Sequence, residues 1–279
     1  MIVIGSRGSQ LALWQARHIA SLLHVETRIE IIKTTGDKIQ DVPLSQVGGK
    51  GLFTKEIEEA LLDRRIDLAV HSLKDMPSEL PEGLVLAAIP EREDPRDALI
   101  GAPLKEGARV GTSSLRRSVQ LMSMRRGLLI ETLRGNIDTR IRKLDEGQYD
   151  TIVLAAAGLR RLGWADRISE LLAVDVMIPA VGQGALAIET REDRGEAFEL
   201  AQALDHRASR IAITAERAFL AVFGGGCQVP IGAHATVSGL EIHLRAFVSE
   251  PDGSGVKRGE FGGDDPVAVG QRLAKELAG

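Results

Sequence analysis

Short apolar segments alternate with amphipathic ones along most of the chain, and this alternation constrains the fold more than any other feature. Within the 279 residues, the apolar segments have the length and composition of buried strands: residues 1–5, 25–34, 67–73 and 150–156. The segments between them repeat apolar residues at helical spacing, as Leu13, Ala16 and Ile19 do after the candidate N-cap Ser9. Strands that alternate with helices form a mainly parallel sheet covered on both faces. The pattern therefore predicts an α/β fold.

A charged, proline-containing stretch at residues 91–97 interrupts the alternation, as a linker or hinge does. A second α/β unit begins after it, and we expect the strand at residues 185–189 to return to the first unit. Residues 231–237 and 240–249 are typical of antiparallel strands, and a terminal helix begins near Pro266. These last elements predict a small α+β domain at the end of the chain.

Composition argues against several classes of function. The formal net charge of −4 gives no general attraction to nucleic acid or acidic membranes, and aromatic residues are only 3% of the chain, too few for a base-stacking surface. The first residues lack the basic and apolar regions of a signal peptide, and no apolar run approaches the ~20 residues of a membrane span. With a single cysteine, the expected location is the cytoplasm.

The single cysteine, Cys227, cannot form an intrachain disulfide. It follows Gly224, Gly225 and Gly226, whose lack of side chains leaves the sulfur open to close approach. A thiol in such a loop is a candidate for covalent chemistry. The alternative is a buried cysteine that acts as a small hydrophobic residue.

Many basic residues fall just after a predicted strand or in the first turns of a predicted helix: Arg7, Lys50, Lys74, Arg116, Arg117, Arg134, Arg140 and Arg161. In open α/β sheets such loops line the ligand crevice, and helix N-termini there attract anions. The hydroxyls of Thr112, Ser113 and Ser114 add donors, and a planar guanidinium suits a carboxylate. Arg116 and Arg117 can serve one ligand only near the open end of a helix. We therefore expect a carboxylate site; for any single arginine, solvated surface charge is the alternative.

Asp75 is the acidic residue among these bases. It follows a predicted strand, directly after Lys74 and before Met76 and Pro77. In a positively lined site its carboxylate would stay ionised and could stabilise positive charge that develops on a substrate. A residue that simply forms the turn at the strand end is the alternative. The chain has no His, Cys, Asp and Glu grouping with zinc-ligand spacing, no P-loop and no dinucleotide fingerprint.

Taken together, these motifs resemble the porphobilinogen deaminase family, also called hydroxymethylbilane synthases. The similar segments run in family order through nearly the whole chain: residues 6–16, 48–53, 69–77, 91–97, 111–117, 133–140, 181–185 and the loop around Cys227. As a set these motifs are highly specific, whereas any one of them alone is not. The part beyond Cys227 matches least, and Gln46 stands where many members carry a lysine, which weakens the case for a cation there.

The resemblance implies an α/β fold with two periplasmic-binding-protein-like domains and a central cleft, plus a small C-terminal α+β domain. The expected domains are residues 1–92 with 184–204, residues 93–183, and residues 205–279. It also implies that Cys227 carries a dipyrromethane cofactor through a thioether. Four porphobilinogen units would be joined head-to-tail on this primer, each losing ammonia, before hydrolysis releases hydroxymethylbilane. The expected protein is a cytoplasmic, monomeric transferase of tetrapyrrole and haem biosynthesis.

The same resemblance implies roles for individual residues. Asp75 would be the catalytic residue that contacts pyrrole N–H groups and stabilises a cationic, azafulvene-like intermediate. The cofactor would be held covalently by Cys227, and by Lys50, Ser72, Lys74, Asp75, Thr112, Ser114, Arg116, Arg117 and Arg134. Porphobilinogen and the growing chain would be held by Arg7, Ser9, Gln15, Phe53, Asn136, Arg140, Arg161 and Gln183. No metal is expected.

A rival hypothesis is a non-catalytic two-domain binding protein for a small carboxylate. The same fold and the same arginines would suit it. It gives no reason for Cys227 in a glycine loop or for Asp75 among bases. Absorbance and intact mass of the purified protein would separate the two hypotheses.

Overall fold

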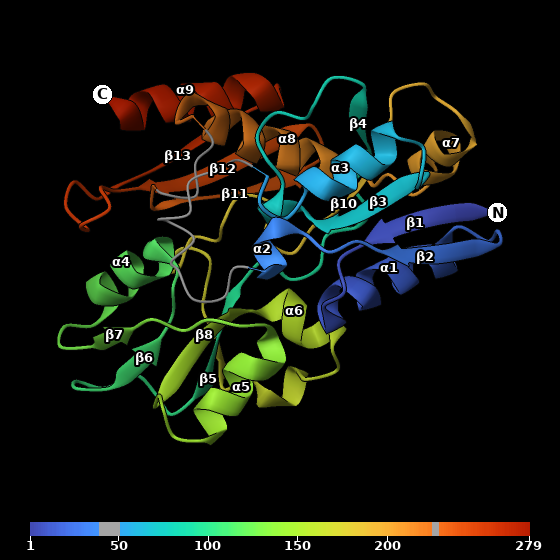
Figure 1. The fold of residues 1–279 in the computed structure, drawn as a ribbon. Coiled ribbons are helices and arrows are strands. Elements are labelled where there is room, and N and C mark those ends of the chain that lie inside the picture. The colour runs from blue at the N-terminus through green and yellow to red at the C-terminus, as the bar shows by residue number, and fades with distance from the viewer. Residues whose placement is uncertain (39–50, 225–228) are drawn as a thin grey trace. The chain divides into compact units, whose positions relative to one another are not determined.

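The computed structural model describes residues 1–38, 51–224 and 229–279. The described residues form two compact units, Met1–Glu93 with Ala185–Arg210 and Asp94–Gly184 with Ile211–Gly279. The first division of the chain thus falls inside the charged stretch 91–97, where the sequence indicated a linker. The expected boundaries of three separate domains stay a prediction. Figure 1 shows the helices and strands in chain order.

The first unit is built on a five-stranded sheet in the order β2-β1-β3-β10-β4. Its strands are β1 (Ile2–Ser6), β2 (Thr27–Ile31), β3 (Leu68–Ser72), β4 (Leu84–Ala88) and β10 (Leu186–Arg191). β1 pairs in parallel with β2 and β3, whereas β10 runs antiparallel to both of its neighbours, β3 and β4. The return of the chain to this sheet, expected from residues 185–189, is confirmed.

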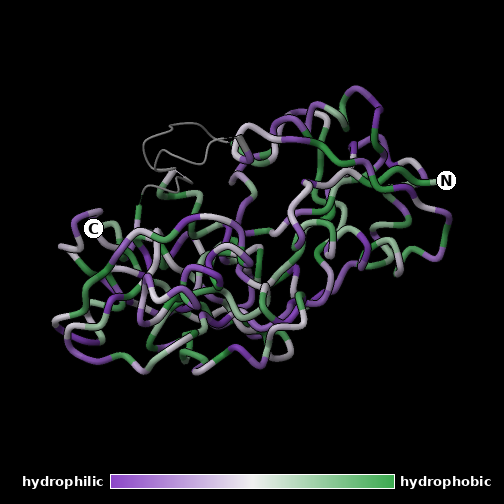
Figure 2. The backbone as a smooth tube through the Cα atoms, turned by 60° about the horizontal axis from the view of Figure 1, so that its bottom comes forward, coloured by the Kyte–Doolittle hydropathy of each residue, from purple (hydrophilic) through white to green (hydrophobic). Residues whose placement is uncertain are grey.

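Helices cover both faces of this sheet because successive side chains along its strands point to opposite faces, and both faces are apolar. Leu68 and Val70 pack on the side of α1 (Gln10–Leu22) and α7 (Glu196–Gln202), whereas Ala69 packs with Ile57 and Leu61 on the side of α3 (Lys55–Leu62). The helices of this unit are α1 (Gln10–Leu22), α2 (Thr35–Lys38), α3 (Lys55–Leu62), the 3-10 helix Leu73–Asp75 and α7 (Glu196–Gln202). The hydrophobic start of the chain at β1 is clear beside the N label in Figure 2.

The second unit contains a five-stranded sheet with the same pattern of strand order, β7-β6-β8-β5-β9. Its strands are β5 (Asp97–Gly101), β6 (Arg109–Gly111), β7 (Leu129–Glu131), β8 (Thr151–Ala155) and β9 (Glu170–Leu171). β6 is parallel to β7 and β8, and β5 is antiparallel to β8 and β9. Its helices are α4 (Leu115–Met124), α5 (Ile137–Asp145), α6 (Ala156–Arg161) and the 3-10 helix Ala165–Arg167.

The alternation of β5 decides which side chains face α4. Ala98 and Ile100 pack on the side of α5 and α6, whereas Leu99 packs with Leu121 of α4. Because side chains alternate along a strand, Asp97 lies on the same side as Leu99, toward α4. An acidic residue thus enters a buried face of the sheet at the start of β5.

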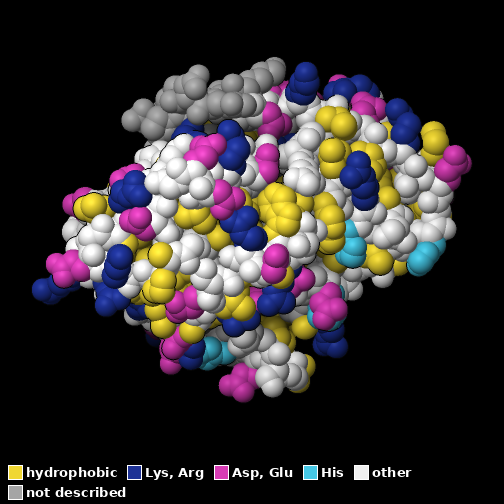
Figure 3. Space-filling view, turned by 90° about the horizontal axis from the view of Figure 1, so that it is seen from below, with side chains coloured by type: hydrophobic (Ala, Val, Ile, Leu, Met, Phe, Trp, Pro, Cys, Tyr) yellow, Lys and Arg dark blue, Asp and Glu magenta, His cyan; other side chains and the backbone are white. Residues whose placement is uncertain are grey.

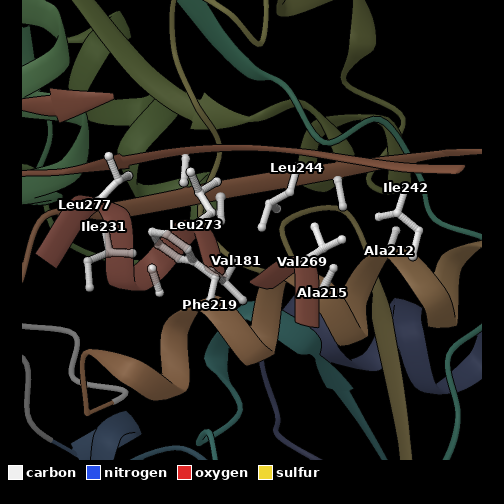
Figure 4. Packing of buried hydrophobic residues seen from close by; sticks show 14 of the residues in the cluster. Val181, Ala212, Ala215, Phe219, Ile231, Ile242, Leu244, Val269, Leu273 and Leu277 are labelled. Carbon is white, nitrogen blue, oxygen red and sulfur yellow. The ribbon is translucent and has the colours of Figure 1, made fainter. Parts of the chain in front are cut away.

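The end of the chain forms a three-stranded antiparallel sheet, β11 (Ile231–Ser238), β12 (Glu241–Val248) and β13 (Lys257–Gly263), covered by α8 (Arg207–Val222) and α9 (Pro266–Ala278). Leu244, Phe219 and Leu273 meet in its core (Figure 4). A Cβ at Gly270 would lie 2.3 Å from the Ala215 carbonyl oxygen, so only glycine allows α9 this close to α8. The α/β class with a small C-terminal α+β domain is confirmed.

Glu216 joins this part to the chain that leads toward β10. Its side chain is fully buried, and its two carboxylate oxygens accept hydrogen bonds from the backbone N–H groups of Gly182 and Ala235, each at 2.8 Å. A buried carboxylate needs such donors to replace the water it has lost. Glu216 therefore fixes residues 180–184 against α8 and β11.

The surface carries both charge signs. On the face drawn in Figure 3, basic and acidic side chains are interspersed rather than segregated. Among the described residues, no helix is both long and apolar enough to span a membrane.

Candidate active site

Asp75 lies on a short, well-anchored turn. β3 ends at Ser72, and the 3-10 helix that follows closes with a hydrogen bond from the Met76 N–H to the Leu73 carbonyl. Leu73 and Met76 are buried on either side, and the Leu73 N–H donates to the carbonyl of Ala185 just before β10. Asp75 itself is exposed. The sheet thus holds the backbone still while the carboxylate points away from the core.

Within the part of the chain that the structure describes, no hydrogen bond or ion pair engages the Asp75 carboxylate. An aspartate that only forms a turn normally bonds to a backbone N–H two residues on. The turn at residues 73–76 closes through backbone groups alone. This arrangement favours a carboxylate held ready for a ligand over the turn-forming alternative.

Two more of the predicted residues meet beside this turn. Gln15 of α1 donates from Nε2 to the Ser72 hydroxyl at 2.8 Å. Ser9 caps α1 as the sequence indicated, because its hydroxyl accepts a hydrogen bond from the Ala12 N–H. Ser9 therefore stabilises the helix that positions Gln15.

Arg7 and Phe53 also come together in the first unit. The guanidinium carbon of Arg7 lies 4.2 Å from the centre of the Phe53 ring, within cation–π range. Arg7 Nε donates to Asp37 at 3.1 Å. Burial works to raise the pKa of Asp37, but hydrogen bonds from Arg7 and Thr34 outweigh it and lower the pKa. Sequence reasoning missed this internal partner of Arg7.

In the second unit, the hydroxyl residues expected to bind anions build the N-terminus of α4. The Ser114 hydroxyl caps the helix by accepting from the Arg117 N–H, and the Thr112 hydroxyl accepts from the Ser114 N–H at 3.2 Å. Ser113 donates to the Leu133 carbonyl at 2.7 Å. The hydroxyls thus shape the loop, and the helix terminus carries its usual partial positive charge.

Arg116 and Arg117 converge on one protein carboxylate, Asp97. The Asp97 side chain is fully buried; its Oδ2 lies 2.8 Å from Nη1 of Arg116, and its Oδ1 accepts from Nη2 of Arg117 at 2.7 Å. Burial raises the pKa of Asp97, but the two guanidinium groups more than offset this and hold it well below its usual range. The spacing predicts a shared ligand near the open end of a helix, and in the structure the group that both arginines contact is a carboxylate of the protein.

Gln183 and Arg161 contact the segment that leads to β10. Gln183 Nε2 donates to Asp97 Oδ1 at 3.0 Å and to the Pro95 carbonyl at 2.7 Å. Arg161 donates from Nη2 to the Gly184 carbonyl at 2.6 Å. Both residues, expected to hold substrate, therefore also order the backbone around residues 183–184.

Arg134, Asn136 and Arg140 gather at the N-terminus of α5. Asn136 is the N-cap residue, and its side chain makes no capping hydrogen bond. Arg140 donates from Nε to the Gly135 carbonyl at 2.7 Å. Gly135 adopts a positive φ of 111°, which suits a residue without a side chain. The expected positions of Lys50, Gln46 and Cys227 lie outside the described residues.

Comparison with known proteins decides the family. A family model for the dipyrromethane cofactor-binding domain of porphobilinogen deaminase matches residues 2–199, and one for its C-terminal domain matches residues 210–279. The chain belongs to the porphobilinogen deaminase family. The porphobilinogen deaminase of Roseiflexus sp. (strain RS-1) is 54% identical, with 99% of this chain and 95% of that protein covered. That of Brevibacillus brevis is 51% identical, with 98% and 93% covered.

Solved structures of binding proteins are less similar in sequence to this chain than these porphobilinogen deaminases are. Substrate-binding domain 2 of Lactococcus lactis GlnP is 10% identical, with a TM-score of 0.41 and 80% of this chain and 90% of that chain covered. A substrate-binding domain of an amino acid transporter from Streptococcus pneumoniae is 14% identical, with a TM-score of 0.41 and 81% and 96% covered. Membership of the deaminase family does not favour the rival hypothesis of a non-catalytic binding protein.

The donor set suits the cofactor of the porphobilinogen deaminase family. Dipyrromethane brings carboxylate side groups and pyrrole N–H groups, so it needs cations and at least one anionic acceptor. The second unit supplies cations at the N-termini of α4 and α5, and the first unit, taken by itself, supplies the exposed Asp75 carboxylate at the end of β3. The residues present therefore fit the group, which in this chain attaches to the single cysteine, Cys227. Among the described residues, no cluster could hold a metal ion.

Proposed function

We propose that the protein is a hydroxymethylbilane synthase that joins four porphobilinogen units head-to-tail. Water then breaks the bond between the product and the primer, so the linear tetrapyrrole leaves with a hydroxyl group and the primer regains a proton. Each addition breaks the C–N bond to the departing ammonia and forms one C–C bond between pyrroles, with loss of a proton from the attacking carbon. The dipyrromethane on Cys227 supplies the pyrrole carbon on which the first unit is joined. We propose a thioether as its link to the protein.

Asp75 is the residue that we assign to the chemical step. When ammonia leaves, positive charge develops on the substrate pyrrole, and a fixed carboxylate stabilises that charge. Its backbone is anchored by buried Leu73 and Met76, so the point from which the carboxylate projects is held in place. This assignment is carried by an exposed carboxylate on an anchored turn that has no partner among the described residues.

The basic residues bind and orient the carboxylates of the cofactor and of the growing chain. Every pyrrole unit carries two carboxylates, so a lengthening chain gathers negative charge that needs many cations. Helix N-termini and charge-assisted hydrogen bonds from arginine provide such sites. We assign the cofactor carboxylates to Lys50, Ser72, Lys74, Thr112, Ser114, Arg116, Arg117 and Arg134, and the substrate to Arg7, Ser9, Gln15, Phe53, Asn136, Arg140, Arg161 and Gln183.

For the cellular setting, we propose a monomer in the cytoplasm that acts on porphobilinogen without a nucleic-acid or membrane partner. The net charge of −4 and the mixed charges of the face in Figure 3 support this proposal. Sedimentation at several protein concentrations tests the oligomeric state. If the protein dimerised, its average sedimentation coefficient would rise with concentration, because the fraction of dimer would rise.

The experiment for the main proposal is a single-turnover assay with porphobilinogen on the purified protein. One equivalent of ammonia should be released for each unit added, and the intact mass should rise stepwise by the mass of one deaminated pyrrole unit. A protein that binds porphobilinogen without ammonia release or mass increase would contradict the proposal and restore the binding-protein hypothesis.

A further inference from the structure

Asp97 is a fully buried charged group of the second unit, and none of the roles above uses it directly. It opens β5 and faces α4, where three hydrogen-bond donors and the guanidinium of Arg116 surround its carboxylate. Oδ1 accepts from Nε and Nη2 of Arg117 and from Nε2 of Gln183 at 3.0, 2.7 and 3.0 Å. Oδ2 lies 2.8 Å from Nη1 of Arg116. A buried aspartate of this kind persists only when its charge is balanced.

The two arginines are engaged to different extents. Arg117 uses all three of its nitrogens on the protein, because Nη1 also donates to the Val153 carbonyl at 3.0 Å. Arg116 uses only Nη1, which contacts Asp97 and donates to the Ile178 carbonyl at 2.6 Å. In the ranges that the structure describes, Nε and Nη2 of Arg116 have no hydrogen-bond partner. The fork of Arg117 is thus occupied, whereas one edge of Arg116 is not.

The backbone partners of both arginines are themselves fixed. Val153 lies in the middle of β8, and Ile178 is held by Gln120, whose side chain accepts from the Ile178 N–H at 2.9 Å and donates to its carbonyl at 3.1 Å. Arg116 and Arg117 are 5% and 6% exposed, so neither can swing into solvent without breaking these contacts. Their geometry is therefore preset before any ligand binds.

We infer that Arg117 is a positioning residue that neutralises Asp97, so that the positive charge of Arg116 stays uncompensated and serves a carboxylate of the cofactor or of the growing chain. This inference rests on the proposed function and changes one of its assignments: Arg117 acts on the cofactor carboxylate through Asp97 and Arg116 rather than by direct contact. It follows from charge: one carboxylate and two guanidinium groups leave a single net positive charge. Without Arg117, Asp97 and Arg116 would cancel, and the site would lose its attraction for an anion.

The inference makes a rescue test possible. Arg117→Leu should slow the acquisition of dipyrromethane from porphobilinogen by roughly tenfold or more, as the loss of a charge-assisted contact does. Asp97→Asn combined with Arg117→Leu should recover most of that rate, because the charge of Arg116 is uncompensated again. Asp97→Asn combined with Arg116→Leu is the matched control and should not recover. The readout is the fraction of cofactor-bearing protein over time, measured by intact mass.

Thermal unfolding of the same variants separates positioning from mere support of the fold. Asp97→Asn alone leaves two buried guanidinium groups with less compensation, so the midpoint should fall while cofactor acquisition is maintained or faster. A purely structural role would lower both together. If Arg117→Leu does not fold, Arg117→Lys and Arg116→Lys replace it: Arg117→Lys keeps the compensating charge and should load better than Arg116→Lys.

Two outcomes overturn the inference. One is a folded double variant, Asp97→Asn with Arg117→Leu, that loads no faster than Arg117→Leu, since Arg117 would then bind the carboxylate itself. The other is equal loading of the two lysine variants. A wild-type protein that carries no dipyrromethane at all would instead count against the proposed function.

Discussion

Gln15 on α1 donates a hydrogen bond to the hydroxyl of Ser72 at the end of β3, with 2.8 Å between Nε2 and Oγ. Gln15 is only 2% exposed, so its amide has lost most of its water and depends on this partner. The bond fixes the strand end one residue before the 3-10 helix that carries Asp75. The precision of the turn thus depends on a helix that begins far from it in sequence.

Gln15→Met keeps much of the side-chain volume and removes this hydrogen bond. We expect a loss of about 0.5–1.5 kcal/mol in the free energy of unfolding, the usual net worth of one such bond. Chemical denaturation of Gln15→Met, Ser72→Ala and the double variant measures it. If the two single effects simply add in the double variant, the two side chains are not coupled and the prediction is wrong.

Asp75→Asn should keep the fold and the attached cofactor but lose turnover. Removal of one preorganised electrostatic stabiliser commonly lowers the rate by ~10²–10³, and Asn has the same size without the charge. Asp75→Glu should retain some activity, because it keeps the charge at a shifted position. Single-turnover ammonia release from cofactor-bearing protein provides the measurement. Near wild-type release from Asp75→Asn would remove Asp75 from the mechanism.

Cys227→Ser should carry no covalent adduct and should be inactive. A hydroxyl is a far weaker nucleophile than a thiolate, and the chain has no second cysteine to replace it. Intact mass compares the two proteins, and the wild type should be heavier by two linked pyrroles. An unmodified wild-type mass with full activity would contradict both the adduct and the role of Cys227.

Acid should destabilise the fold through Asp97. Its pKa is lowered in the folded state by Arg116 and Arg117, against the effect of burial, so its charge contributes stability above the unfolded value of 3.8. That contribution is lost as the pH falls from 3.8 toward the lower folded pKa. At pH 7 the melting temperature of Asp97→Asn should therefore be lower than that of the wild type. Between pH 7 and pH 2.5 it should decline less steeply than that of the wild type.

Glu58 provides a control, because its pKa is shifted in the opposite direction to that of Asp97. Burial raises its pKa above the ordinary value of 4.5. A carboxyl group with a raised folded pKa contributes stability below its unfolded pKa and loses it as the pH rises through the folded value. Glu58→Gln should therefore make the protein more stable near neutral pH than the wild type. A lower melting temperature at pH 7 would show that the charged form is better accommodated than its burial indicates.

The sequence predicted those parts of the fold that depend on local periodicity. The cap of Ser9, the helices after residues 114 and 136, and the return of the chain at β10 all follow from spacing along one segment. The antiparallel direction of β10 was not predicted, because the pairing partners of a strand lie far away in sequence.

At the site, the sequence predicted which residues carry charge but not which of them balance one another. The sequence pattern predicts a charged linker that includes Asp97, whereas in the structure Asp97 opens a buried strand with Ala98, Leu99 and Ile100. An acidic residue beside such an apolar run was the signal available, since it requires buried cations. Its partners Arg116 and Arg117 come from a different helix, and only the packing of β5 against α4 brings them together.

The place of β10 between β3 and β4 governs how the protein is made. During synthesis, β3 and β4 leave the ribosome before the strand that pairs with both of them. That strand, β10, begins only at Leu186, after the whole segment Asp94–Gly184. Until then both strands expose unpaired edges, the kind of surface that chaperones recognise and that aggregates. The first sheet begins at the start of the chain but is completed only when β10, Leu186–Arg191, has been translated. The turn that carries Asp75 therefore gains its last support after nearly 200 residues have been made.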